Sequence, residues 1–170
     1  EGGAPESISD TFCYEPQNSQ ERRAGHLFVA GELRNVIPSD IKLLDNLSAS
    51  LKTNYYASWL GGPEAASKAA LKKANEFLEE TAKSGQVSWL GNLHLGICGV
   101  AEAKRESFIA NFAKVGQIKI LLLRAGQVLD IGKNLDFSEI EPYPLKVFSN
   151  IVSGQLEHDD IVAIMTRSVF

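Results

Sequence analysis

Histidine and cysteine are the side chains of this chain best suited to metal binding or nucleophilic chemistry, and they are few. The three histidines, His26, His94 and His158, lie far apart and show no metal-ligand spacing. His94 and Cys98 fall on one face of a predicted strand, but two soft ligands do not complete a zinc site. We therefore interpret His94 as a core or half-buried side chain, and His158 as an exposed residue of a polar turn.

Short motifs that carry a mechanism are absent from the sequence as well. It contains no Gly-x-x-x-x-Gly-Lys-Ser/Thr loop for phosphates, no Gly-x-Gly-x-x-Gly dinucleotide fingerprint and no Gly-x-Ser-x-Gly nucleophile elbow. Any chemistry must therefore come from residues that the fold brings together. The elements of that fold decide which residues meet.

Two helices are predicted in the first half of the chain. Apolar residues recur every three or four positions from Leu44 to Tyr55, after a helix start signal at Pro38 and Ser39. A second helix is predicted from Pro63 to Gly85, with a small apolar stripe from Leu71 to Ala82 facing inward. These helices are amphipathic and are expected to cover one face of a sheet.

Strands are predicted on both sides of the helices, because apolar residues there alternate with period two. The predicted strands are Thr11–Tyr14, Gly25–Arg34, Leu93–Cys98, Ser107–Phe112, a hairpin over residues 117–131 and Ile161–Met165. Between the last two, Gly132–Pro144 is predicted to be an irregular loop and Leu145–Val152 a short helix. Helices in one block and strands in another favour the α+β class over a parallel sheet.

Composition narrows the function classes further. The 170 residues are 44% hydrophobic and 22% charged, which is typical of one globular domain, with a net charge of −4 and a pI near 5.4. This acidic balance argues against a nucleic-acid partner. No apolar run is long enough to insert into a membrane, and two cysteines are typical of a reducing compartment, so a cytoplasmic location is expected.

The ends of the chain suggest how the domain is delimited. We expect residues 1–10 to be a flexible segment, and residues 11–170 to form a single domain. The sequence begins at Glu1 without a methionine, and its last predicted strand runs almost to Phe170. Both features suggest an excised piece of a larger protein, truncated at its C-terminus.

Five short segments keep a shared order and spacing. They are Val29-Ala30-Gly31-Glu32, Val115-Gly116-Gln117-Ile118-Lys119, Arg124-Ala125-Gly126, Leu156-Glu157-His158-Asp159-Asp160 and Thr166-Arg167-Ser168-Val169. In this order they resemble the Val-Ala-Asp-Gly, Val-Gly-Asp-Ser-Arg, Arg-x-Gly, Leu-x-x-Gly-Asp and Ser-Asp-Gly-Leu motifs of the PPM family of metal-dependent protein Ser/Thr phosphatases. The resemblance spans about residue 8 to residue 170. It implies a PPM phosphatase-like antiparallel β-sandwich flanked by helices, in α-β-β-α layers.

The same resemblance implies a degenerate active site. PPM phosphatases use carboxylates to hold two Mg²⁺ or Mn²⁺ ions, whose bridging water attacks the phosphate. Here the corresponding positions are Gly31, Gln117 and Arg167, none of which is an acid. Only Asp10 can match the opening acidic motif, and Glu32 lies one residue out of register. Asp10 and Glu32 are thus the remaining candidate metal ligands, no catalytic residue is assigned, and no cofactor is expected.

Arg167 suggests a replacement for the missing metal. If its guanidinium lies where an ion would sit, it would supply the positive charge and form an ion pair with Glu32 or Asp10. The loss of an acid at Gly31 and the gain of a base at Arg167 motivate this hypothesis. The alternative is an exposed arginine at the end of a strand.

Three functions follow from these observations. The first is a catalytically inactive, PPM-like pseudophosphatase domain that acts as a binding or regulatory module toward a protein partner. The second is an active Mg²⁺- or Mn²⁺-dependent phosphatase with ligands from Asp10, Glu32 and residues beyond the chain. The third is an unrelated α+β protein, which a fold without two stacked antiparallel sheets would establish. Gly132–Pro144, with Phe137, Ile140 and Tyr143, is a candidate binding surface, although these side chains are equally suited to pack back onto the sheet.

Overall fold

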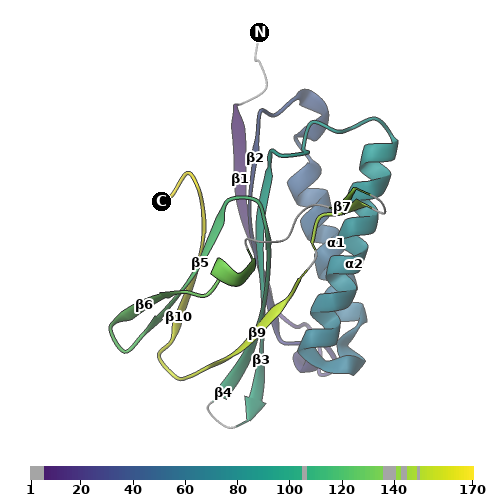
Figure 1. The fold of residues 1–170 in the computed structure, drawn as a ribbon. Coiled ribbons are helices and arrows are strands. Elements are labelled where there is room, and N and C mark those ends of the chain that lie inside the picture. Colours follow the sequence, from purple (N-terminus) through teal and green to yellow (C-terminus); the bar gives the residue numbers. More distant parts are fainter. Residues whose placement is uncertain (1–5, 105–106, 136–140, 143–144, 149) are drawn as a thin grey trace.

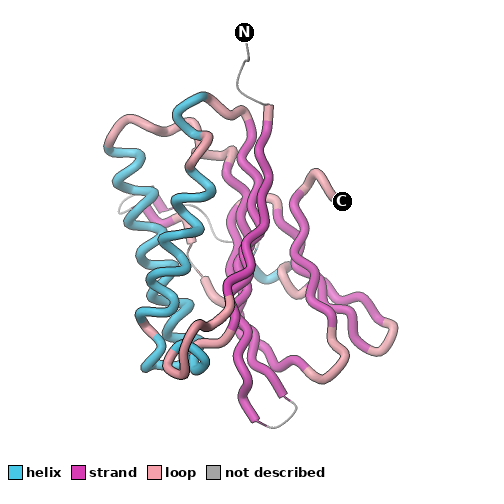
Figure 2. The backbone as a smooth tube through the Cα atoms, turned by 180° about the vertical axis from the view of Figure 1, so that it is seen from behind, coloured by secondary structure: helices cyan, strands magenta, loops and turns pink. Residues whose placement is uncertain are grey.

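The molecule consists of a helical pair and two antiparallel sheets stacked in layers (Figure 1). The structure, a computed structural model, describes residues 6–104, 107–135, 141–142, 145–148 and 150–170. Helices α1 (Leu43–Ala57) and α2 (Gly62–Lys83) lie side by side on one face of a five-stranded sheet, here called the first sheet. A three-stranded second sheet covers part of the opposite face, as the view from behind also shows (Figure 2).

The strand order differs from the chain order in both sheets. The first sheet runs β1-β2-β3-β4-β9 and the second runs β10-β5-β6, with every neighbouring pair antiparallel. The strands of the first sheet are β1 (Ser7–Tyr14), β2 (His26–Arg34), β3 (Leu93–Lys104), β4 (Ser107–Val115) and β9 (Val152–Leu156). Those of the second are β5 (Ile118–Arg124), β6 (Gln127–Asp130) and β10 (Ile161–Thr166). A two-stranded ladder, β7 (Glu141–Pro142) with β8 (Leu145–Lys146), completes the strands, and β8 lies beside α2.

The helices form where the apolar stripes predict them. Leu47, Leu51 and Tyr55 of α1 are fully buried, as is Leu78 of α2. They pack with residues of β2 and β3 into one apolar core between the helices and the first sheet. Burial of each leucine contributes roughly 1.5–3 kcal/mol, so this stripe accounts for much of the helical stability.

A second core fills the space between the two sheets. Ile118, Ile120 and Leu122 point inward from β5 and pack with Cys98 and Phe112 of the first sheet. The sheets approach closely because β3 carries Gly96 at this point. A Cβ atom there would lie 2.6 Å from Ile164 Cγ2, so any side chain would push the sheets apart.

Several sequence predictions are confirmed and some are corrected. The α+β class with two stacked antiparallel sheets is confirmed, so the fold that would establish an unrelated α+β protein is not found. The second helical layer of the expected α-β-β-α arrangement is not found: among the described residues, no α-helix covers the outer side of the second sheet (Figure 1). Strand β1 begins at Ser7, so residues 7–10 belong to the sheet rather than to a flexible segment.

The short helix predicted over Leu145–Val152 is wrong. Its first two residues form β8, and Val152 begins β9. The apolar spacing suggested a helix, but the backbone N–H groups of Val147 and Phe148 bond to Asn75 of α2 instead. A tertiary contact therefore overrides the local pattern. Most of the candidate surface at Gly132–Pro144, including Phe137, Ile140 and Tyr143, lies outside the described residues.

Membrane insertion is not suggested by any helix that the structure describes. Neither α1 nor α2 combines the length and apolar character needed to cross a bilayer.

Candidate functional site

The strand register places Asp10 and Glu32 on opposite faces of the first sheet. Asp10 lies opposite Gly31 on the neighbouring strand, whereas Glu32 lies opposite Ser9 and His94. Directly opposed residues share a face, and successive residues alternate between faces. The face of Gly31 is the one toward the helices, because a Cβ atom there would lie 3.1 Å from Leu44 Cδ2 of α1. The two candidate metal ligands are therefore not brought together.

Glu32 is buried beneath the end of the second sheet and already has a cationic partner. Its side chain accepts a hydrogen bond from Arg34 Nε at 2.7 Å, and Ser168 Oγ lies 3.4 Å from its other oxygen. Burial alone would raise the pKa of this carboxyl, but the hydrogen bond and charge of Arg34, with the contact to Ser168, outweigh it. The pKa of Glu32 is therefore below its ordinary value, and the group is ionised at neutral pH.

Arg167 is exposed and has a different partner from the one expected. Its Nη1 donates to Gln117 Oε1 at 2.8 Å, while Glu32 pairs with Arg34. The proposed ion pair of Arg167 with Glu32 or Asp10 is thus replaced by two separate contacts. Arg34 follows Glu32 by two residues on the same strand and shares its face, so that pair forms without ordering a loop. Sequence reasoning overlooked Arg34 because no motif marks it.

His94 is a buried, neutral residue that is hydrogen-bonded to the turn between β4 and β5. Its Nδ1 accepts the backbone N–H of Gln117 at 3.0 Å, so the ring proton of the neutral form is on Nε2. Gly116 makes this possible, because its φ is +69° and a Cβ atom there would overlap the ring. Burial lowers the pKa of His94, and the charges of Arg34 and Arg167 lower it further against the opposing effect of Glu32.

These five residues close one end of the sandwich by pairing with one another. Glu32 and Arg34 come from β2, His94 from β3, and Gln117 and Arg167 from the turns after β4 and β10. Within the described part of the chain, no three His, Cys, Asp or Glu side chains converge on a point that could hold a metal ion. The arrangement is suited to holding the two sheets together rather than to activating water.

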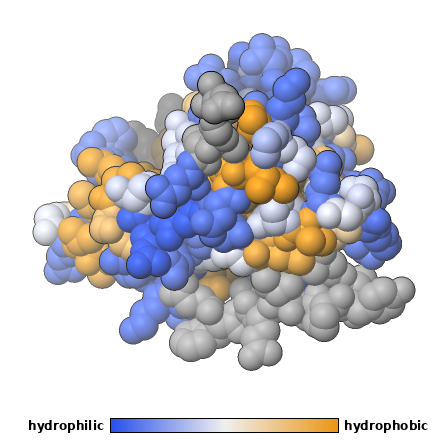
Figure 3. All heavy atoms as spheres, turned by 90° about the horizontal axis from the view of Figure 1, so that it is seen from above, coloured by the Kyte–Doolittle hydropathy of each residue, from blue (hydrophilic) through white to orange (hydrophobic). Residues whose placement is uncertain are grey.

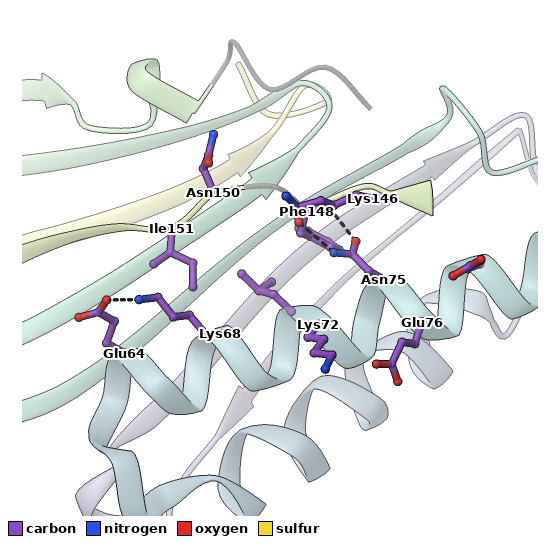
Figure 4. Close-up of a pocket in the computed structure, with 11 residues that line it drawn as sticks. Glu64, Lys68, Lys72, Asn75, Glu76, Lys146, Phe148, Asn150 and Ile151 are labelled. Carbon is purple, nitrogen blue, oxygen red and sulfur yellow. Dashed lines mark hydrogen bonds and ion pairs between the residues drawn. The ribbon is translucent and has the colours of Figure 1, made fainter. Parts of the chain in front are cut away.

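A second candidate site is a groove along α2, which sequence reasoning did not single out. It has a volume of about 620 Å³ and an apolar floor formed by Leu71, Phe148 and Ile151. Charged side chains on its rim include Glu64 and Lys68, which form an ion pair with each other (Figure 4). Volumes of this order are typical of ligand pockets.

Asn75 holds the far wall of this groove in place. Its Oδ1 accepts the backbone N–H groups of Val147 and Phe148 at 2.9 and 2.8 Å, and its Nδ2 donates to the carbonyl of Phe148 at 2.9 Å (Figure 4). Asparagine is a poor residue for a helix interior, and its position in α2 was the sequence signal for a tertiary role.

Replacing Asn75 with alanine is expected to cost about 2 kcal/mol in the free energy of unfolding. Three hydrogen bonds are lost, and two part-buried backbone donors are left without their acceptor. Asn75→Asp keeps the acceptor and is expected to cost less. Urea denaturation measures both variants, and amide hydrogen exchange at Val147 and Phe148 should accelerate in Asn75→Ala first. Equal exchange in the wild type and Asn75→Ala would contradict the assignment.

Comparison with known proteins gives a likeness in fold. No family model matches the chain, and no curated protein matches its sequence. Among solved structures, it is similar to PppA, described as a key regulatory component of T6SS in Pseudomonas aeruginosa, with a TM-score of 0.53. The two share 15% sequence identity over 92% of this chain and 74% of that chain.

The fold is PPM-like. At this level of identity, the likeness concerns the architecture alone. The three positions that the sequence motifs single out are Gly31 near the end of β2, Gln117 in the turn after β4, and Arg167 after β10. All three lie around the closed end of the sandwich described above.

Proposed function

We propose that this chain is a PPM-like domain without phosphatase activity, and that it works as a binding or regulatory module for a protein partner. The observation that supports this most directly is the register of β1 and β2. It directs Asp10 and Glu32 to opposite faces and leaves Glu32 paired with Arg34. A two-metal phosphatase needs its carboxylates on one side, converging on the ions.

A binding role is further supported by the surface around the second sheet. Val128 of β6, Ile161 of β10 and Val169 near the C-terminus are large apolar side chains that are mostly exposed. Seen from above, hydrophobic residues reach the surface in patches separated by hydrophilic ones (Figure 3). Exposed apolar patches of this kind are typical of interaction surfaces. PppA has a regulatory role by its description, which is compatible with a regulatory role here.

Phosphatase assays test the proposal directly. We expect no turnover of p-nitrophenyl phosphate or of a phosphoserine peptide by the purified chain in the presence of Mn²⁺ or Mg²⁺. In isothermal titration with Mn²⁺, the wild type, Asp10→Ala and Glu32→Gln should all give the same heat, because neither acid is expected to bind the metal. Turnover that is abolished by a chelator and by Asp10→Ala would overturn the proposal and establish the alternative, an Mg²⁺- or Mn²⁺-dependent protein phosphatase.

We also propose that the domain works in a reducing compartment, such as the cytoplasm. Cys13 and Cys98 are both free thiols, and burial raises the pKa of Cys98 to about 12. Such a thiol remains protonated and unreactive at neutral pH.

A further inference from the structure

The two sheets of the sandwich differ in width, and the difference leaves a recess beside β10. Strand β10 lies over β2 and β3, so β1 extends beyond it, and no strand of the described residues lies above β1. The resulting cleft has a volume of about 470 Å³ and is lined by residues of β1, β2, β3 and β10, with Leu156 of β9 at one end. Its walls include Phe28, Ala30, Val162 and Ile164, and most of its lining is apolar.

Small side chains form the floor of this recess. The residues of β1 that share a face with Phe28 and Ala30 are Cys13 and Thr11, and the same row continues through Ser9 and Ser7. All four residues of this row are exposed. A row of small residues under an apolar wall leaves room for the side chains of another strand, since stacked sheets are about 10 Å apart.

The edge of β10 is open to hydrogen bonding from the same side. Within the described part of the chain it pairs with β5 alone, so the backbone groups on its other side are open to a further strand. Exposed edges of this kind are templates for an added strand. Because β1 projects past β10, the first sheet of a second copy paired through β10 would occupy the same space as β1. The space is therefore suited to a single extended segment rather than to another copy of the domain.

Charges at the two ends of the recess have opposite signs. Glu157, Asp159 and Asp160 precede β10 and outnumber Arg124, which pairs with Glu157 and Asp160. Exposed Arg167 follows β10. Arg34, at the end of β2, also lies near this end, but it is paired with Glu32, so Arg167 is the cation that determines the sign here. A segment that pairs with β10 therefore complements these charges if it carries a basic residue at the Asp159 end and an acidic residue at the Arg167 end.

We propose that this recess binds an extended segment of a partner protein, which adds to β10 as a fourth strand of the second sheet. Alternate apolar side chains of the segment pack against Phe28, Val162 and Ile164. Its direction is antiparallel to β10, as in every ladder of this fold, so its acidic residue comes first and its basic residue last. This proposal rests on the proposed function as a binding module and specifies the chemistry of its partner.

A synthetic peptide tests the proposal without knowledge of the natural partner. The probe is a fluorescein-labelled Glu-Val-Thr-Val-Thr-Val-Thr-Val-Lys peptide, and its matched control exchanges the two charged ends. Fluorescence anisotropy should show that the wild type binds the first peptide about tenfold more tightly than the control. Arg167→Glu should abolish or reverse that preference. Equal binding of both peptides by the wild type, or no binding of either, would overturn the proposal.

Filling the floor locates the binding site. Thr11→Trp and Cys13→Trp place a large side chain in the recess at exposed positions, where the fold has room for it. Each should weaken peptide binding by at least about tenfold, whereas Asn46→Trp, at an exposed position of α1 on the other side of the first sheet, should leave it unchanged. Unchanged binding by Thr11→Trp and Cys13→Trp would overturn the proposal. So would a dimer in sedimentation that Thr11→Trp converts to monomer, because the recess would then hold a second copy.

The result is separable from that of the phosphatase assay. If the wild type binds no peptide, only the proposal that the recess is a binding site is contradicted. If it shows chelator-sensitive turnover, only the proposal that the domain lacks phosphatase activity is contradicted.

Discussion

Introducing aspartate at Gly31 is expected to destabilise the domain by about 4 kcal/mol or more and to create no metal site. The position faces the helices, and its new Cβ atom would lie 2.7 Å from Leu95 Cδ1 and 3.1 Å from Leu44 Cδ2. The carboxylate would therefore enter an apolar core, where an unpaired charge is costly. Thermal unfolding followed by circular dichroism, with and without Mn²⁺, measures the effect.

Gly31→Ala is the matched control for steric crowding. Its methyl group meets the same two leucine side chains but carries no charge, so a cost of about 2 kcal/mol is expected. The difference between the two variants isolates the cost of burying the carboxylate. A rise in the melting temperature of Gly31→Asp on addition of Mn²⁺ would show that position 31 faces a metal site after all.

Replacing Arg34 with methionine is expected to cost about 3 kcal/mol at neutral pH, because it leaves the buried carboxylate of Glu32 without its cation. In the wild type, Arg34 holds the pKa of Glu32 below its value in the unfolded chain. Glu32 therefore stabilises the fold at pH values above its unfolded pKa, and this stabilisation is lost as the pH falls through its folded pKa. Without Arg34, burial dominates and raises the pKa of Glu32. The variant should therefore recover toward the wild type as the solution is acidified.

The double variant Glu32→Leu with Arg34→Met separates the lost pair from lost packing. Removing both charges leaves no unpaired carboxylate, so its stability at neutral pH should lie much closer to that of the wild type. Urea denaturation between neutral and mildly acidic pH measures all three proteins. If the difference in the free energy of unfolding between the wild type and Arg34→Met does not decrease on acidification, the assigned ion pair is contradicted.

Much of the fold could be predicted from the sequence, because its elements follow simple periodicities. The stripe from Leu44 to Tyr55 and the alternation from Ile118 to Leu122 each bury the residues that their spacing predicts. The short helix over Leu145–Val152 failed because the side chain of Asn75, far away in the sequence, determines that segment. Local patterns contain no information about such a contact.

The candidate site was less predictable, because it depends on register and on residues that no motif marks. The sequence identifies Gly31, Gln117 and Arg167 as positions without acids, but it does not show which face each side chain occupies. The pairing of Asp10 with Gly31 supplies that information and separates Asp10 from Glu32. Arg34 is the residue that neutralises Glu32, and only the structure brings it into the site.

The strand order also has a consequence for how the chain folds. β1 to β4 are consecutive neighbours in the first sheet, and the β5–β6 hairpin closes locally, so both can form early. β9 and β10 are the last strands in the chain, and each must return to an edge strand formed long before: β9 to β4, and β10 to β5. During synthesis, the sandwich can therefore close only after nearly the whole chain has left the ribosome. Until then the inner faces of both sheets are exposed to water, and that interval is when the chain is most prone to aggregate.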